Sequence, residues 1–131
     1  KLFKIIWYKA IDMGRKISPS LLFDKWIKLD MWIQFNNAFL SIVENRDNEL
    51  ELLVRARIKG DIEKIFPEAD VFEDDSADYK YRAFISKAKV AARMMLKMTE
   101  INYDNFKNSV KEIERKSVYN NVWIELRKLQ K

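Results

Sequence analysis

Arginines and tyrosines recur in two short stretches of the sequence, and together they could form a nucleic-acid-binding surface. The residues are Arg55, Arg57, Tyr79, Tyr81 and Arg82. Aromatic side chains that stack on bases, flanked by basic side chains, are how a four-stranded sheet binds single-stranded RNA. The glycines and aromatics of the RNA-recognition signature are absent here. The spacing therefore favours core tyrosines and paired surface arginines, and we keep the five residues as a candidate binding site.

A second group of residues that could do chemistry is a dense run of carboxylates. The residues are Asp70, Glu73, Asp74, Asp75 and Asp78. Carboxylate oxygens bind Mg²⁺ and Ca²⁺, so a metal-dependent hydrolase is one hypothesis for this segment. The EF-hand pattern fails because its central glycine and closing Glu are missing. We therefore expect a solvated acidic turn, with no metal site and no cofactor.

The chain contains no histidine and no cysteine. Their absence excludes Ser-His-Asp and Cys-His catalysis, His-ligated zinc and thiolate metal sites. Asp61 and Glu63 are two residues apart in a predicted helix, so they do not face each other as an acid/base pair. We therefore expect a non-enzymatic protein with no catalytic residues. Lack of cysteine also fits a reducing cytoplasm.

Aromatic and methionine side chains are more numerous than a small core obviously needs. The residues in question are Trp7, Trp26, Trp32, Met94, Met95, Met98 and Trp123. Aromatics and methionine are enriched at protein interfaces, which makes Trp123 a candidate binding residue. The alternative is that all of these side chains belong to the core.

The net charge of +5 is divided into blocks of opposite sign. Residues 1–30 hold seven Lys/Arg against three Asp/Glu, residues 31–79 five against twelve, and residues 80–131 thirteen against five. Such blocks can attract each other within one fold or across a dimer, or form separate acidic and basic faces.

The central folding unit of the sequence is residues 50–67. It reads as a strand, a glycine turn, a short helix begun by Gly60-Asp61 and a stop at Pro67. In the strand, Val54 and its alternate neighbours should meet helices, whereas Arg55 and Arg57 fall on the opposite face. Asp61 is well placed for the N-terminal dipole of the helix.

Further strands are predicted at residues 39–43, 71–73 and 79–85. The last alternates cleanly, with Tyr79, Tyr81, Ala83 and Ile85 on the core face. Ser86 should cap a helix that runs to about Thr99, and its stripe is Val90, Met94, Met98 and Ile101. A short helix follows near residues 106–113. Residues 116–129 form the final helix, with Tyr119, Val122, Trp123, Leu126 and Leu129 inward.

These elements predict an α+β fold with a four-stranded, mostly antiparallel sheet and helices on one face. The two ββα units either interleave, as in a ferredoxin-like fold, or lie side by side. Residues 31–131 should form a single compact domain. Residues 1–30 should form a helical extension whose apolar stripe packs on the domain, although a membrane-surface helix is the alternative. No apolar run is long enough to span a membrane.

From Met31 onward the chain resembles a family of small bacterial proteins of unknown function. The matching segments are Met31-Trp32, residues 39–43, 53–57, 60–63, 77–83 and 101–107, and Tyr119 with Val122-Trp123. In that family Met-Trp lies at the very start, which implies a start at Met31 and leaves open whether residues 1–30 are native. Members often carry a His just before the tyrosine that matches Tyr119, whereas this chain has none. The resemblance implies a domain boundary and a fold, and no activity.

Three functions follow from these observations. The first is a protein-interaction module that binds a protein partner or itself. The second is a nucleic-acid-binding module that uses the basic residues 80–131 and the N-terminal helices. The third, the metal-dependent hydrolase around residues 70–78, has the least support.

Overall fold

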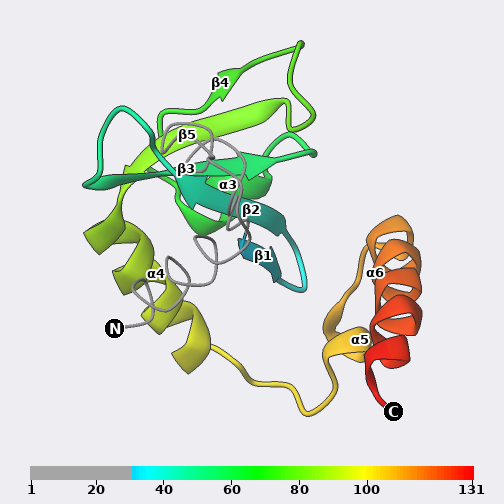
Figure 1. Ribbon diagram of the computed structural model, residues 1–131. Helices are drawn as coiled ribbons and strands as arrows, with labels where there is room; N and C mark the ends of the chain where they lie inside the picture. Colours follow the sequence, from blue (N-terminus) through cyan, green and yellow to red (C-terminus); the bar gives the residue numbers. More distant parts are fainter. Residues whose placement is uncertain (1–30) are drawn as a thin grey trace, which may run out of the picture.

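The computed structural model describes residues 31–131, so the two helices predicted in residues 1–30 lie outside the described range. The strands are β1 (Met31–Gln34), β2 (Phe39–Glu44), β3 (Glu51–Ala56), β4 (Phe72–Glu73) and β5 (Tyr81–Ser86). The helices are α3 (Asp61–Ile65), α4 (Lys87–Thr99), α5 (Phe106–Ser109) and α6 (Ile113–Leu126), and a 3₁₀ turn follows at Arg127–Leu129. Figure 1 shows α4 at the lower left, next to the sheet, and α5 and α6 together at the right, beyond the β1-β2 turn.

All neighbouring strands in the sheet are antiparallel, and their order is β1-β2-β3-β5-β4. The α+β class is therefore confirmed, but the sheet has five strands in place of the predicted four. The missed strand is β1, which is only four residues long and too short to show a clear alternation of apolar and polar residues. Because β3 pairs directly with β5, the hairpins β2-β3 and β4-β5 lie side by side and do not interleave.

The hydrophobic core lies between one face of the sheet and the helices α3 and α4. Strand residues Leu40, Val54, Ala56 and Ala83 are fully buried there. The helices contribute Ile62, Ile65, Phe66 and Val90 to the same cluster. The predicted inward face of β3 is thus confirmed, because alternate side chains of a strand point to opposite faces.

Helix α3 begins where the sequence predicts, directly after Gly60. This glycine has φ 90°, in the left-handed region that L side chains rarely adopt. The helix ends at Ile65, and Phe66 is its C-terminal cap, one residue before Pro67. Pro67 thus follows the end of the helix, as expected for a residue that cannot donate a backbone hydrogen bond.

Replacing Gly60 with Ala is expected to lower the free energy of unfolding by about 1–2 kcal/mol. A Cβ at this position would meet no atom within 4 Å, so the cost comes from the left-handed backbone alone. Chemical denaturation measures the loss. Asn, which tolerates this conformation better, serves as the control and should cost less.

Helix α4 is capped as predicted, since the Ser86 hydroxyl accepts a hydrogen bond from the Lys89 backbone N–H at 3.3 Å. Its predicted stripe is only partly used. Val90 is buried and Met94 packs against the core, but Met98 near the end of the helix is exposed, and so is Ile101, which follows the helix. Among residues 31–131, no helix is both long and apolar enough to cross a membrane.

Helix α6 begins at Ile113, three residues earlier than predicted, and its contacts with the body of the domain are confined to its first half. Tyr119 is buried, as predicted, and Val122 is half-buried. The predictions for Trp123, Leu126 and Leu129 are wrong, because all three are exposed. They follow the part of the helix that meets the β1-β2 turn, so the core of the described domain does not cover them.

Candidate functional site

The sheet face opposite α3 and α4 has no helix of the described residues packed on it. Strand pairing places Trp32, Ser41, Arg55, Arg82 and Phe72 side by side in one row, one residue from each strand. The two described helices that pack on the sheet contribute to the core on the other side. We call this surface the open face because no helix of residues 31–131 covers it; at its centre Ser41 and Arg55 are nevertheless buried. Its central row contains two of the five arginine and tyrosine candidates, Arg55 and Arg82.

Aromatic pairs lie at both ends of the open face. At the β1 end, the rings of Trp32 and Phe39 meet edge to face with their centroids 6.0 Å apart. At the β4 end, Phe72 stacks on Phe84 at 5.6 Å. Three of the four side chains are well exposed, with Trp32 at 64%, Phe84 at 47% and Phe72 at 42%. Exposed aromatics on a sheet surface are the kind of side chain that anchors a binding partner.

The centre of the open face is polar and cationic. Arg55 is only 8% exposed and donates a hydrogen bond from Nη2 to Ser41 Oγ at 2.7 Å. Its guanidinium carbon lies 4.6 Å from the centroid of the Tyr79 ring, and that of Arg57 lies 4.3 Å from the same ring. Tyr79 is thus held by two cation–π contacts, each of the kind that stabilises by about 0.5–2 kcal/mol.

Two sequence predictions about these residues are wrong. Tyr79 is buried, as predicted, but it does not share the core face with Tyr81 and Ala83, because β5 begins only at Tyr81 and Tyr79 packs beside the arginines. Arg55 is not a surface arginine but a buried one. Tyr81 pairs with Ala56 and packs against the core, so it does not contribute to the open face.

The acidic turn between β4 and β5 is neutralised by neighbouring cations. Lys80 contacts Glu73 at 3.3 Å and Asp75 at 2.6 Å, and Arg82 lies 3.5 Å from Asp74. Hydrogen bonds from Ser76 hold the pKa of Asp74 below its ordinary value. In residues 31–131 no group of three or more potential ligands gathers to hold a metal ion. The acidic turn therefore offers no support for the hydrolase hypothesis.

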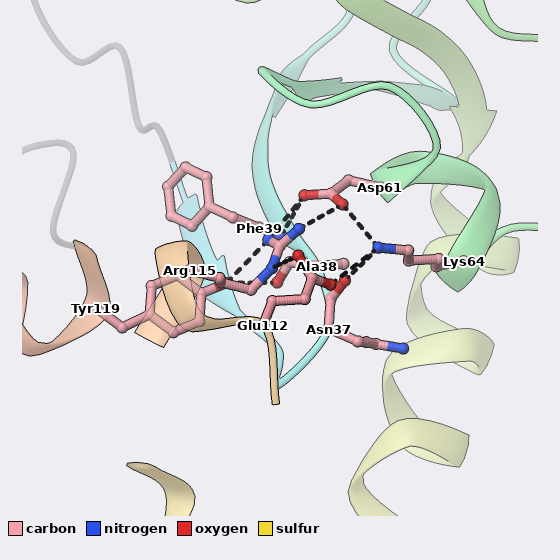
Figure 2. A network of polar contacts seen from close by, with 8 residues as sticks. All are labelled: Asn37, Ala38, Phe39, Asp61, Lys64, Glu112, Arg115 and Tyr119. Atoms are coloured by element: carbon pink, nitrogen blue, oxygen red, sulfur yellow. Dashed lines mark hydrogen bonds and ion pairs between the residues drawn. The ribbon is translucent and has the colours of Figure 1, made fainter. Parts of the chain in front are cut away.

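A buried charge network fixes α6 to the rest of the domain (Figure 2). Arg115 donates two hydrogen bonds to Asp61, at 2.8 and 2.9 Å, and both side chains are almost completely buried. Asp61 Oδ2 also accepts the backbone N–H of Phe39 at 3.0 Å. Asp61 therefore does more than begin α3: its carboxylate joins α3, the start of β2 and α6.

The periphery of this network adds weaker contacts. Glu112 accepts a hydrogen bond from Arg115 Nε at 3.0 Å and lies 3.4 Å from Lys64. The hydrogen bond from Arg115 is the main reason that the pKa of Glu112 is lowered. Burial alone would lower the pKa of Arg115, but its hydrogen bonds to Asp61, Tyr119 and Glu112 raise it overall. The guanidinium thus stays charged, and the network is structural.

Tyr119 completes the attachment of α6. Its hydroxyl donates a hydrogen bond to the carbonyl of Ala38 at 2.8 Å, and its ring stacks on Phe106 of α5. Burial raises the pKa of Tyr119 above its ordinary value. The tyrosine that the sequence placed inward therefore connects both C-terminal helices to the turn before β2.

The Tyr119→Phe variant is expected to be less sensitive to alkaline pH than the wild type. Because the folded pKa of Tyr119 is raised, its contribution is fully present below about pH 10 and is lost as the pH rises through the folded pKa. At neutral pH the variant should lose about 1 kcal/mol. The hydrogen bond to Ala38 and the longer one from Arg115 at 3.4 Å disappear, while the Ala38 carbonyl keeps that from Phe35 and Arg115 keeps those to Asp61. Urea unfolding at neutral pH and at about pH 11 measures both effects, and equal alkaline losses would contradict the assignment.

Trp123, the remaining candidate, lies on α6 and takes no part in the open face. Lys107 Nζ of α5 is 3.6 Å from its ring centroid, and the Arg127 guanidinium carbon is 5.1 Å away. The ring is 43% exposed. Trp123 is therefore an exposed aromatic residue flanked by two cations, separate from the arginines of the sheet.

The sequence reasoning missed Phe72 and Phe84 as candidates. Phe84 was predicted on the non-core face with Lys80 and Arg82. An apolar side chain among these cations could have indicated an exposed aromatic residue at a binding surface. Arg115 was also missed, since it lies 54 residues from Asp61 and before the predicted start of the last helix. No local pattern connects two residues at that separation.

Comparisons of the chain with protein-family models, with curated proteins and with solved structures found no match in any of the three.

Proposed function

We propose that this protein is a non-enzymatic protein-interaction module and that its binding surface is the open face of the sheet. The observation that carries the proposal is the exposure of Trp32, Phe72 and Phe84 on a face that no helix of residues 31–131 covers. Large exposed aromatic side chains grouped on one surface are favourable sites for burial by a partner.

The arrangement of the open face indicates what the partner presents. Aromatic pairs at both ends provide apolar contact area, and Arg57 and Arg82 add positive charge between them, with Arg82 paired to Asp74. A complementary protein surface would place apolar side chains on either side of a carboxylate. A second copy of the chain is the alternative partner.

The composition of the chain also bears on the proposal. The chain has neither His nor Cys, and its buried charges are used for structure, which favours binding over catalysis. The lack of cysteine favours a reducing cytoplasm as its location. The likeness of the run from Met31 to small bacterial proteins of unknown function is itself a proposal and adds only a domain boundary.

Affinity capture with the full chain tests this function. Wild-type protein, a Trp32→Ser variant and an Ile124→Ser variant would be immobilised in parallel and exposed to the same lysate, while light scattering records the mass of each. Ile124 is an exposed apolar residue of α6, so its variant is a matched control outside the open face.

The proposal predicts one of two results. Either a protein is retained by the wild type and by Ile124→Ser but not by Trp32→Ser, or the wild type is a dimer that Trp32→Ser dissociates. A strictly monomeric wild type that captures no protein would contradict the function. Equal losses from the two variants would contradict the assignment to the open face.

A further inference from the structure

The exposed side of α6 carries a basic stripe with one aromatic residue at its centre. Lys116, Asn120, Trp123 and Arg127 follow one another at intervals of four, three and four residues, so they lie on one side of the helix. All four are exposed. Lys107, brought close by the packing of α5 on α6, places its ammonium group over the Trp123 ring. We call these five residues the α6 stripe.

The cations of the α6 stripe have no acidic partners within the described chain. Lys107, Lys116 and Arg127 make no ion pair among residues 31–131, whereas two carboxylates of the same part of the chain already have other partners. Glu112 is bound by Arg115, and Glu125 lies 2.7 Å from Lys128. Two cations at the indole ring, Lys107 and Arg127, and a third further along the helix, Lys116, therefore produce a local excess of positive charge.

We propose that the α6 stripe binds single-stranded nucleic acid. The three cations would pair with successive phosphates, the exposed part of the Trp123 ring would stack on a base, and the Asn120 amide would donate to or accept from a base edge. Aromatic side chains flanked by Arg and Lys bind single strands without sequence preference, because every base has a stacking face. The site lies on α6 and uses no residue of the open face.

The chemistry of the α6 stripe fits a nucleic acid better than an acidic protein. None of its five residues is aliphatic, and the exposed Ile113 and Ile124 adjoin the stripe only at its edge, so its centre lacks the apolar side chains that protein interfaces bury. Its one aromatic ring lies between two cations, the arrangement that suits alternating bases and phosphates. Duplexes present no unstacked base to Trp123, which favours a single strand.

Fluorescence anisotropy of a labelled oligo(dT) with the full chain tests the proposal. We expect binding at low salt that weakens as salt rises, with a logarithmic slope of about 0.7 for each phosphate neutralised. Trp123→Ala should weaken binding about tenfold through lost stacking. The double variant Lys107→Gln/Arg127→Gln should reduce the salt slope by about 1.4.

The control is Lys87→Gln/Lys89→Gln, which removes the same charge from exposed positions in the first turn of α4. It should bind like the wild type, and melting curves would verify that every variant is folded. No anisotropy change at low salt, or an equal loss in the control, would overturn the proposal. It would also be overturned if duplex DNA or polyglutamate displaced the probe as well as unlabelled oligo(dT) does.

Discussion

Replacing Asp61 with Asn is expected to lower the free energy of unfolding by about 3–5 kcal/mol. The substitution keeps the size of the side chain and its acceptor for the Phe39 backbone N–H, so it removes chiefly the negative charge. Arg115, whose side chain is only 3% exposed, would then be a buried cation without its main partner. Glu112 remains as a partner for Arg115 Nε, but it is about half exposed and compensates weakly.

A double-mutant cycle in urea measures the interaction between the two charges. Arg115→Met should also be strongly destabilising, because it leaves the Asp61 carboxylate buried. The double variant Asp61→Asn/Arg115→Met should lose less than the sum of the single losses, with a coupling energy of about 1–3 kcal/mol. Losses that simply add would contradict the role given to the pair.

The control for this cycle is Glu112→Gln, which removes an exposed charge from the same network. Its expected cost is below about 1 kcal/mol, the usual value for an exposed ion pair. A Glu112→Gln loss as large as that of Asp61→Asn would show that burial is not what distinguishes the two carboxylates.

The second large effect is expected from two consecutive residues of β5 that point to opposite faces. Phe84 is exposed on the open face, whereas Ile85 is 7% exposed and belongs to the core. Ile85→Ala should cost about 2–5 kcal/mol of unfolding free energy, since it leaves a cavity. Phe84→Ser should cost no more than about 1 kcal/mol, mainly through its lost stacking on Phe72.

For partner binding, the larger loss is expected from Phe84→Ser and not from Ile85→Ala. Phe84→Ser should weaken partner binding at least tenfold, because an aromatic side chain buried by a partner is commonly a hot spot of about 2 kcal/mol or more. Ile85→Ala, studied well below its melting temperature, should bind like the wild type. A Phe84→Ser variant that is much less stable but binds normally would show that the ring belongs to the core.

The fold could be predicted from the sequence wherever a local period was strong. The alternation in β3 and β5 placed Val54, Ala83 and Ile85 in the core, and the structure confirms each. Ser86 and Gly60 marked the starts of two helices because each residue type suits that backbone position. The side-by-side order of the hairpins depends on the contact between β3 and β5, which no local pattern encodes.

The candidate site could be predicted only in part, for the same physical reason. Arg55 and Arg57 were found by residue type and placed on the correct strand face, but the burial of Arg55 depends on Ser41 and Tyr79 from other strands and turns. Tyr79 was assigned to the wrong face because the strand was predicted to begin at residue 79, two residues before β5 begins. Trp123 was named as a candidate binding residue by its type, but its predicted inward position on the last helix was wrong, because the ring is exposed.

The proposed function places partner binding on the open face of the sheet. The most direct measurement is a calorimetric titration of the captured protein into the wild type, Trp32→Ser/Phe84→Ser and Ile124→Ser. If the partner is a second copy, the corresponding measurement is the dimer dissociation constant. The open-face double variant should bind at least a hundredfold more weakly, as expected when two aromatic contacts are lost, while Ile124→Ser should match the wild type. An unchanged affinity for the double variant, with folding intact, would contradict the claim.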